Sequence, residues 1–217
     1  MALIIGYIHV CQMGNWHLPF DMIMTKVKEC GLYDASSEIR IGVVNNHNFV
    51  INDHRFNDPK IKIVAHGPSC NYERTTLHHM RKYSKHDSSC QYWYCHTKGI
   101  THFDNNDLNK KHCVLDWINL MIHWNIVKWR IATEKLFTHD TYGCDHTNNP
   151  EPHFSGNFWW ANSHYIKTLS KKIGEEYCDP EFWLLSRKFG NPVMVCNIYS
   201  SGLDGGDHYF HRINRLE

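Results

Sequence analysis

Apolar residues form short, nearly continuous runs in the first half of the chain, a pattern typical of strands that are covered on both faces of a sheet. These runs predict four strands, at residues 2–10, 39–44, 60–65 and 91–95. Helices are expected at residues 19–31 and 72–84; Pro19 suits a first helical turn, and Gly31 suits a helix end. The resulting order, β-α-β-β-α-β, predicts an α/β fold with a mostly parallel central sheet flanked by helices.

The second half of the chain is less regular. Apolar residues recur at steps of three and four from about residue 109 to 137, which predicts one long helix or two shorter ones. Further strands are expected at 142–144 and 192–198, further helices at 165–173 and 181–186, and a short hairpin at 49–51. No repeat, low-complexity tract or linker divides the sequence. We therefore interpret residues 1–217 as a single domain, either whole or as a piece of a longer chain.

The composition narrows the class of protein. Hydrophobic residues make up 42% of the chain and charged residues 21%, which is enough apolar material for a sizeable core. Lys and Arg total 23 against 22 Asp and Glu, so we expect no nucleic-acid partner. The nine cysteines form no CxxC pair, and we expect reduced thiols and a cytoplasmic location. The apolar start is too short for a signal peptide or a membrane span, so we expect no membrane span.

Polar residues follow each of the four predicted strands. They include His9 and Cys11 after the first strand, Asn45 after the second, His66 after the third, and His96-Thr97-Lys98-Gly99 after the fourth. Loops are often polar, but ligands of open α/β sheets bind at the carboxyl ends of the strands, so four such ends predict a binding site. Because side chains alternate along a strand, His96 and Lys98 share one side, where His can ligate a metal and Lys can meet a phosphate.

Several common enzyme signatures are absent from the sequence. No GxGxxG or GxxxxGK[ST] follows the first strand, which disfavours a Rossmann dehydrogenase or a P-loop NTPase. No GxSxG and no HExxH occur, which disfavours an α/β-hydrolase and a zinc metalloprotease. The sequence therefore predicts a fold class but shows the signature of none of these activities.

The segment 155–162, SGNFWWAN, combines adjacent tryptophans with small polar residues. Aromatic faces pack on sugars and bases, while Ser and Asn supply directional hydrogen bonds. Trp159 and Trp160 cannot both face one ligand from a strand or a helix, so we expect one of them in the core.

Together these motifs resemble one group of glycosyltransferases with the GT-A fold, the nucleotide-diphospho-sugar transferase type, whose members occur in large DNA viruses and bacteria. The resemblance covers most of the chain, to about Trp183, and is carried by HTKG at 96–99, Asp116-Trp117, TYGC at 141–144, HFSGNFWWAN at 153–162 and a later Glu-x-Trp. It implies a nucleotide-sugar donor, commonly UDP-linked, a glycan or glycoprotein acceptor, and Mn²⁺ or Mg²⁺. For a viral member, the location would be the host cytoplasm.

The resemblance also implies roles for individual residues. The nucleotide is expected at His9, Val10, Cys11, Asn45 and His66; the diphosphate at His96 and Lys98; and the sugar and acceptor at Ser155, Gly156, Asn157, Trp159 and Trp160. Glu181 lies about where inverting members keep the base that deprotonates the acceptor hydroxyl. Alternatively, Glu181 is a carboxylate at a helix start, behind an Asp179 cap and Pro180, and a retaining enzyme would not need it as a base.

The sequence departs from the GT-A pattern at the metal site. Most members carry Asp-x-Asp after the fourth strand, where this chain has His96-Thr97-Lys98. A cation there can neutralise leaving-group charge without a full carboxylate pair. The expected metal ligands are His96 and His208, with Asp104, Asp107 and Asp207 as further candidates.

Two alternative functions come from other classes. A non-catalytic carbohydrate-binding module would stack sugars on Trp and Tyr, but a parallel α/β sheet is a poor match for it. A His-rich metal hydrolase is disfavoured because no compact His/Asp/Glu motif occurs.

Overall fold

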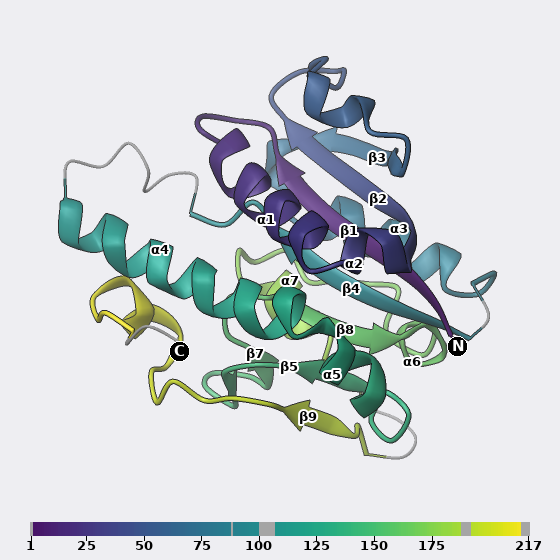
Figure 1. The fold of residues 1–217 in the computed structure, drawn as a ribbon, viewed down its shortest axis with the longest axis vertical. Helices are drawn as coiled ribbons and strands as arrows, with labels where there is room; N and C mark the ends of the chain where they lie inside the picture. Colours follow the sequence, from purple (N-terminus) through teal and green to yellow (C-terminus); the bar gives the residue numbers. More distant parts are fainter. Residues whose placement is uncertain (1, 88, 100–106, 188–191, 214–217) are drawn as a thin grey trace.

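A seven-stranded sheet with helices on both faces forms the centre of the molecule (Figure 1). The computed structural model describes residues 2–87, 89–99, 107–187 and 192–213. The strands of the sheet are, in spatial order, β3 (Ile61–Pro68), β2 (Ser36–Asn45), β1 (Leu3–Cys11), β4 (Cys90–His96), β8 (Trp159–Asn162), β5 (Thr141–Gly143) and β9 (Val195–Asn197). A separate pair, β6 (His146–Thr147) and β7 (His153–Phe154), is antiparallel.

The first four strands of the chain pair in parallel, in the order β3-β2-β1-β4, as the continuous apolar runs predict. Strand β1 is buried on both faces along most of its length. Gly6 lies where the indole of Trp93, on the neighbouring β4, crosses β1, and a Cβ at this position would overlap that ring. The predicted mostly parallel sheet is thus confirmed; these four strands form one side of it, from the edge strand β3 to the central strand β4.

Strand β8 was not expected from the sequence and changes the sheet. It runs antiparallel to both β4 and β5, while β9 is parallel to β5. All four of its residues are buried, so the sequence shows no alternation of polar and apolar positions by which a strand could be predicted. Through β8, residues 141–197 extend the sheet beyond β4.

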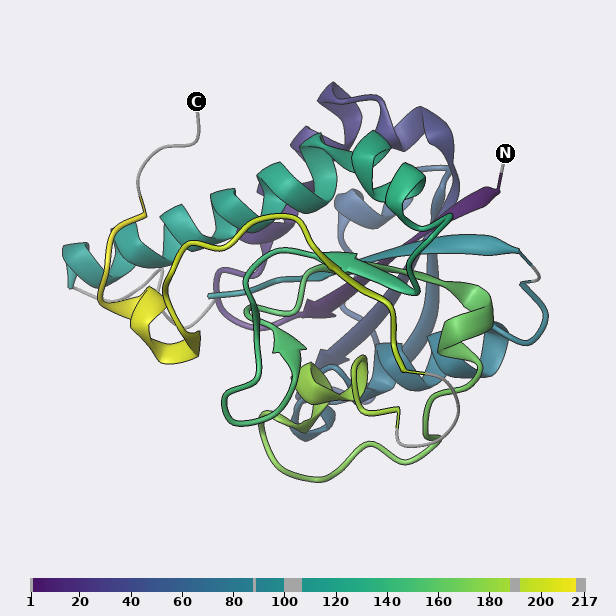
Figure 2. The same ribbon diagram turned by 90° about the horizontal axis from the view of Figure 1, so that it is seen from below.

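The helices lie in two layers, one on each face of the sheet (Figure 2). One layer holds α1 (His17–Glu29), α4 (Leu108–Ile122), a π-helical turn (His123–Val127) and α5 (Trp129–Lys135). The other holds α3 (Arg74–Tyr83), α6 (Ser163–Ile166) and α7 (Asp179–Trp183). Two short helical segments, α2 (Leu32–Ala35) and a 3₁₀ turn (His54–Asn57), join α1 to β2 and β2 to β3. Each layer encloses its own hydrophobic core against the sheet.

Several predicted elements have other bounds in the structure. Of the two alternatives for 109–137, the structure has the two shorter helices, α4 and α5, separated by the π-helical turn. The helix predicted at 165–173 is reduced to the single turn of α6. The predicted hairpin at 49–51 is wrong: the Gln12 side chain bonds the backbone of Ile51 in both directions and holds this segment as a loop. The strand predicted at 192–198 is confirmed only over β9.

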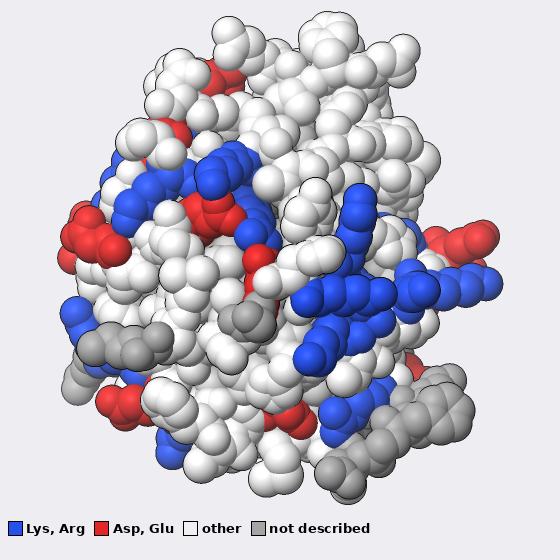
Figure 3. Space-filling model, turned by 90° about the vertical axis from the view of Figure 1, so that its right-hand side faces the viewer, with Lys and Arg blue, Asp and Glu red and all other residues white. Residues whose placement is uncertain are grey.

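Charge is distributed unevenly over the surface. Lys and Arg side chains gather on the face shown in Figure 3, at the side of the molecule where β1 and β4 begin. The basic residues in the last turn of α3 are Arg81 and Lys82. None of the helices among the described residues combines the length and the apolar character needed to cross a bilayer.

Candidate functional site

Two adjoining cavities lie at the carboxyl ends of the parallel strands. There the strand order reverses: β2 and β3 lie on one side of β1, and β4 lies on the other, which is where open α/β sheets bind ligands. The strand-end cavity, of about 420 Å³, is lined by the ends of β1 and β4 and by the turn before α3. The tail cavity, of about 500 Å³, lies between Trp117 of α4 and the C-terminal segment around 204–209. Both cavities are lined by Lys98, Tyr177, Glu181 and Tyr209.

Lys98 is the central charged residue of this site. The residue is only 6% exposed, and its ammonium lies 3.9 Å from the centre of the Trp117 ring. The ammonium makes no hydrogen bond or ion pair with any described residue. A buried cation without an anionic partner is costly, and the face of a tryptophan offsets only part of that cost. An anionic group bound at the junction of the two cavities would supply a partner that none of the described residues provides.

The polypeptide just before Lys98 is fixed by the neighbouring strand. The backbone N–H of Thr97 donates to the carbonyl of His9, and the Thr97 hydroxyl accepts from the backbone N–H of Cys11. Strand β1 therefore holds the end of β4 from one side, and Lys98 leaves the sheet at a defined point.

A buried carboxyl group, Glu73, lines the strand-end cavity and was not predicted from the sequence. Glu73 is 8% exposed; its Oε2 accepts a hydrogen bond from Asn157 Nδ2 at 3.0 Å. Its Oε1 lies 3.0 Å from His96 Nδ1 but makes no hydrogen bond with any residue in the described part of the chain. Burial, and then the charge of Glu181, raises the pKa of Glu73 to about 8. The carboxyl therefore holds its proton at neutral pH.

His96 completes this buried polar group. Its Nε2 donates to the carbonyl of Gly156 at 3.0 Å, which fixes the ring orientation. Burial, and then the charge of Lys98, lowers the pKa of His96 well below its ordinary value. A neutral imidazole and a neutral carboxyl thus face each other beside the Lys98 ammonium, so Lys98 carries the positive charge of this part of the cavity.

The structure brings only some of the predicted nucleotide residues to the cavity. His9 and Cys11 line it, with His9 Nδ1 bonded to the Thr76 hydroxyl at 2.8 Å. The Val10 side chain lies in the hydrophobic core. Asn45 is fully buried; its side chain joins Gln12 and His66, and neither Asn45 nor His66 lines either cavity of the site.

Apart from Ser155, the SGNFWWAN segment packs against the site and does not line either cavity. Ser155 lines the tail cavity, and its buried hydroxyl has no hydrogen-bond partner among the residues that the structure describes. The Asn157 side chain bridges Glu73 and the indole N–H of Trp159. Trp159 and Trp160 are 1% and 0% exposed, so the expectation that one of them faces a ligand is wrong.

The two tryptophans are core residues for a simple geometric reason. As neighbours on β8 they point to opposite faces of a sheet that is covered on both faces. Trp159 stacks on Tyr94 in one core, and the Trp160 indole donates to the Asn125 carbonyl in the other. Gly156, before them, has φ +86° and accepts the His96 bond described above.

The residues expected to hold a metal do not form a metal site. His208 is fully buried, stacks on Trp117 and pairs with Asp145 at 3.1 Å, whereas His96 is bonded to Gly156. Asp107 caps α4 by accepting from Lys110 N. Asp104 lies outside the described residues. Asp207 lines the tail cavity. Within the described ranges, no group of three or more His, Cys, Asp or Glu is placed to bind a metal ion, so these donors do not fit Mn²⁺ or Mg²⁺.

Glu181 lies on α7 at the boundary of the two cavities, half-buried. Asp179 does not cap this helix through its side chain, contrary to expectation; its carboxylate instead accepts from the backbone N–H of Glu176. Glu181 therefore remains the carboxylate that a ligand spanning both cavities would meet, and it is close enough to Glu73 to affect its pKa.

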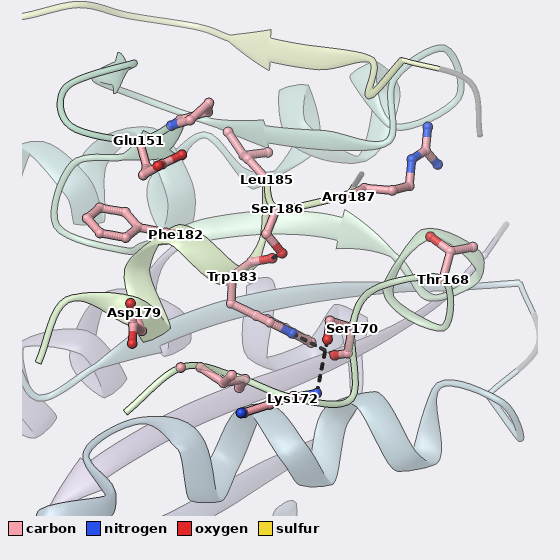
Figure 4. Close-up of a pocket in the computed structure, with 13 residues that line it drawn as sticks. Glu151, Thr168, Ser170, Lys172, Asp179, Phe182, Trp183, Leu185, Ser186 and Arg187 are labelled. Carbon is pink, nitrogen blue, oxygen red and sulfur yellow. Dashed lines mark hydrogen bonds between the residues drawn. The ribbon is translucent and has the colours of Figure 1, made fainter. Parts of the chain in front are cut away.

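A third and larger cavity, of about 770 Å³, lies on the other side of α7 (Figure 4). Phe182 lines both this cavity and the tail cavity. The Trp183 indole bonds the carbonyl of Ser170 across its floor, as the dashed line in Figure 4 shows. None of the residues that the sequence predicts for ligand binding lines it.

Three residues of the site were not predicted from the sequence, for different reasons: Glu73 and the two tyrosines at the mouth of the strand-end cavity, Tyr72 and Tyr177. Tyr72 and Glu73 follow the third predicted strand at the same edge of the sheet as His66, and this position is a signal for a place in the site. The same residues, however, also fit the start of the predicted helix. The role of Tyr177 depends on a loop with no regular structure, which gives no pattern in sequence.

Comparison with known proteins gives a family but no activity. No curated protein matches the chain. A family model described as a domain of unknown function (DUF8361) matches residues 34–173, which include Glu73, His96, Lys98 and Trp117 and exclude Glu181 and His208. Because the match covers more than half of the sequence, the chain belongs to the DUF8361 family.

Proposed function

We propose that this protein is a glycosyltransferase that moves a sugar from a nucleotide-sugar donor, UDP-linked, to a glycan or glycoprotein acceptor. The observation that carries the proposal is the environment of Lys98: the residue is only 6% exposed, its ammonium makes no hydrogen bond or ion pair with the described residues, and it lies at the reversal of the strand order between two cavities. The diphosphate of a nucleotide sugar is an anion of suitable charge for this position.

The arrangement of the sheet supports a nucleotide ligand. The order β3-β2-β1-β4, all parallel, matches the half of a doubly wound fold that binds a mononucleotide at its strand ends. The antiparallel β8 then extends this half with a second set of strands that carries Ser155 and Asn157 to the site. The assignment to the GT-A type is part of this proposal.

The two cavities suit the two parts of a donor. In the proposed complex, the nucleoside lies in the strand-end cavity, the diphosphate meets Lys98, and the sugar lies in the tail cavity near Ser155. Glu181, at the boundary, accepts the proton of the acceptor hydroxyl, whose oxygen then bonds to the sugar carbon. The bond from that carbon to the diphosphate breaks, and Lys98 stabilises the negative charge that develops on the departing phosphate.

The alternative of a carbohydrate-binding module loses its main support. It would stack sugars on Trp and Tyr faces, and the two adjacent Trp rings of SGNFWWAN are both buried.

The proposal is tested by titrating the protein with UDP, GDP and CMP by calorimetry. We expect UDP to bind best, and Lys98→Met to weaken UDP binding by about 10- to 150-fold, the loss of one charge-assisted contact of about 1.5–3 kcal/mol. Lys82→Met is the matched control, because Lys82 also lies over an aromatic ring, Tyr83, but is exposed on α3. Absence of nucleotide binding by the wild type, or unchanged UDP binding by Lys98→Met, would contradict the proposal.

A further inference from the structure

Tyr72 has an unusual backbone conformation at the mouth of the strand-end cavity. Its φ is +47° and its ψ is −137°, a combination that an L-residue with a bulky side chain rarely adopts. Such strain costs on the order of 1–3 kcal/mol and is found mostly where it serves a ligand site. Tyr72 lines the cavity and is 40% exposed, so its ring is not part of a buried core.

Tyr177 faces Tyr72 from a distant part of the chain. It lies in the loop before α7, is 69% exposed and, like Tyr72, lines the strand-end cavity. The ring centres are 5.1 Å apart and the planes are at 90°, so the edge of one ring meets the face of the other. An edge-to-face pair of this kind leaves ring faces accessible to a further flat ring.

The loop that carries Tyr177 is tied to Tyr72 through Arg74. The Arg74 guanidinium donates to the backbone carbonyls of Gly174, at 2.6 Å, and Glu176, and it lies 5.7 Å from the centre of the Tyr72 ring. Arg74 thus fixes the loop 174–177 relative to the turn before α3. The two tyrosines are held in place by backbone contacts while their rings remain open to solvent.

We propose that Tyr72 and Tyr177 form the stacking site for the nucleobase of the ligand. The inference rests on the proposed function, since it concerns the same cavity. Lys98 lines that cavity too, so a nucleotide whose phosphates meet Lys98 can extend to the tyrosines. Stacking of a base on an aromatic side chain contributes about 1–3 kcal/mol to binding. This free energy is comparable with the strain energy at Tyr72, so base binding would offset the strain.

The experiment compares three probes that contain different parts of the ligand: UDP, uridine without phosphate, and inorganic pyrophosphate without base. Tyr72→Gly removes the ring and relieves the strain, because glycine adopts positive φ without a steric cost. We expect it to weaken UDP and uridine by the same factor, about 5- to 150-fold, and to leave pyrophosphate unchanged. Tyr177→Ala should weaken the same two probes, and Tyr72→Phe, which keeps the ring, should bind all three as the wild type does.

Lys98→Met provides the opposite pattern: weaker UDP and pyrophosphate, unchanged uridine. Thermal unfolding supplies a second readout, since Tyr72→Gly should unfold at a temperature equal to or above that of the wild type if the ring is kept for binding. The stacking site alone would be overturned in two cases, both with wild-type protein that binds UDP. In the first, Tyr72→Gly binds UDP as well as the wild type does. In the second, Tyr72→Gly weakens pyrophosphate binding by the same factor as UDP binding. Wild-type protein that binds none of the three probes would overturn the proposed function itself.

Discussion

Replacing Glu73 by glutamine tests whether the buried carboxyl holds a proton at neutral pH. In the folded chain the pKa of Glu73 is about 8, against an ordinary value of 4.5 that applies when the chain is unfolded. Between these two values the folded state keeps a proton that the unfolded state releases. The free energy of unfolding of the wild type therefore falls as the pH rises, by about 1.4 kcal/mol per pH unit from this group.

The magnitude follows from the separation of the two pKa values. About 3.5 pH units correspond to a loss of about 5 kcal/mol at pH 8 and above, an upper value for one buried group. Glutamine is neutral at every pH, has nearly the same shape, and its amide oxygen can still accept from Asn157. The variant should therefore gain stability relative to the wild type as the pH rises from 5 to 8, with no further gain above pH 8.

The assay is urea unfolding followed by tryptophan fluorescence, at each pH from 5 to 9. The difference between Glu73→Gln and the wild type isolates Glu73, because all other titrating groups are common to both proteins. Glu134→Gln, an exposed change on α5, is the control and should show a small difference that does not vary with pH. A difference for Glu73→Gln that is constant from pH 5 to 9 would refute the reasoning.

Three further predictions concern the framework of the site. Trp160→Ala should lower the free energy of unfolding by about 3–5 kcal/mol in denaturant titrations, because the ring is fully buried; a loss below about 1 kcal/mol would contradict its core position. Gly156→Ala should also lower the melting temperature by several degrees, since its positive φ and the overlap of a Cβ with the Met121 sulfur both disfavour alanine; an unchanged melting temperature would argue against this packing. His208→Ala should leave Asp145 buried without its partner, so limited proteolysis should cleave the segment after 198 faster than in the wild type, and equal cleavage rates would show that the pair does not hold the tail.

The parallel half of the sheet is predictable because its physical cause is local. Strands buried on both faces need continuous apolar runs, and β1, β2 and β4 have them. The rule that ligands bind at the carboxyl ends of such strands then selects Lys98 from the sequence alone. By contrast, a run of aromatic residues looks the same in sequence whether it covers a ligand or a core. Trp159 and Trp160 are core residues because helices cover both faces of the sheet.

Other features of the site depend on contacts between distant segments. Glu73 is a buried carboxyl whose hydrogen-bond donor, Asn157, lies 84 residues away in the sequence. His208 is not placed to bind a metal because its Nε2 pairs with Asp145, 63 residues earlier in the sequence. Neither the burial of a carboxyl nor the partner of a histidine can be deduced from local spacing, so the charge states of the cavity follow only from the folded arrangement.

The two tryptophans of β8 have a consequence for how the molecule opens. Because Trp159 belongs to one core and Trp160 to the other, the strand that carries them cannot detach unless both cores come apart. The backbone amides of β4 and β8 should therefore exchange their hydrogens with solvent only when the whole chain unfolds. The walls of the cavities, the loop 174–177 and the segment 204–209, are attached mainly by side-chain ties such as those of Arg74 and His208, and their amides should exchange through local opening. A ligand can thus enter and leave through these walls while the strands that position Lys98 stay closed.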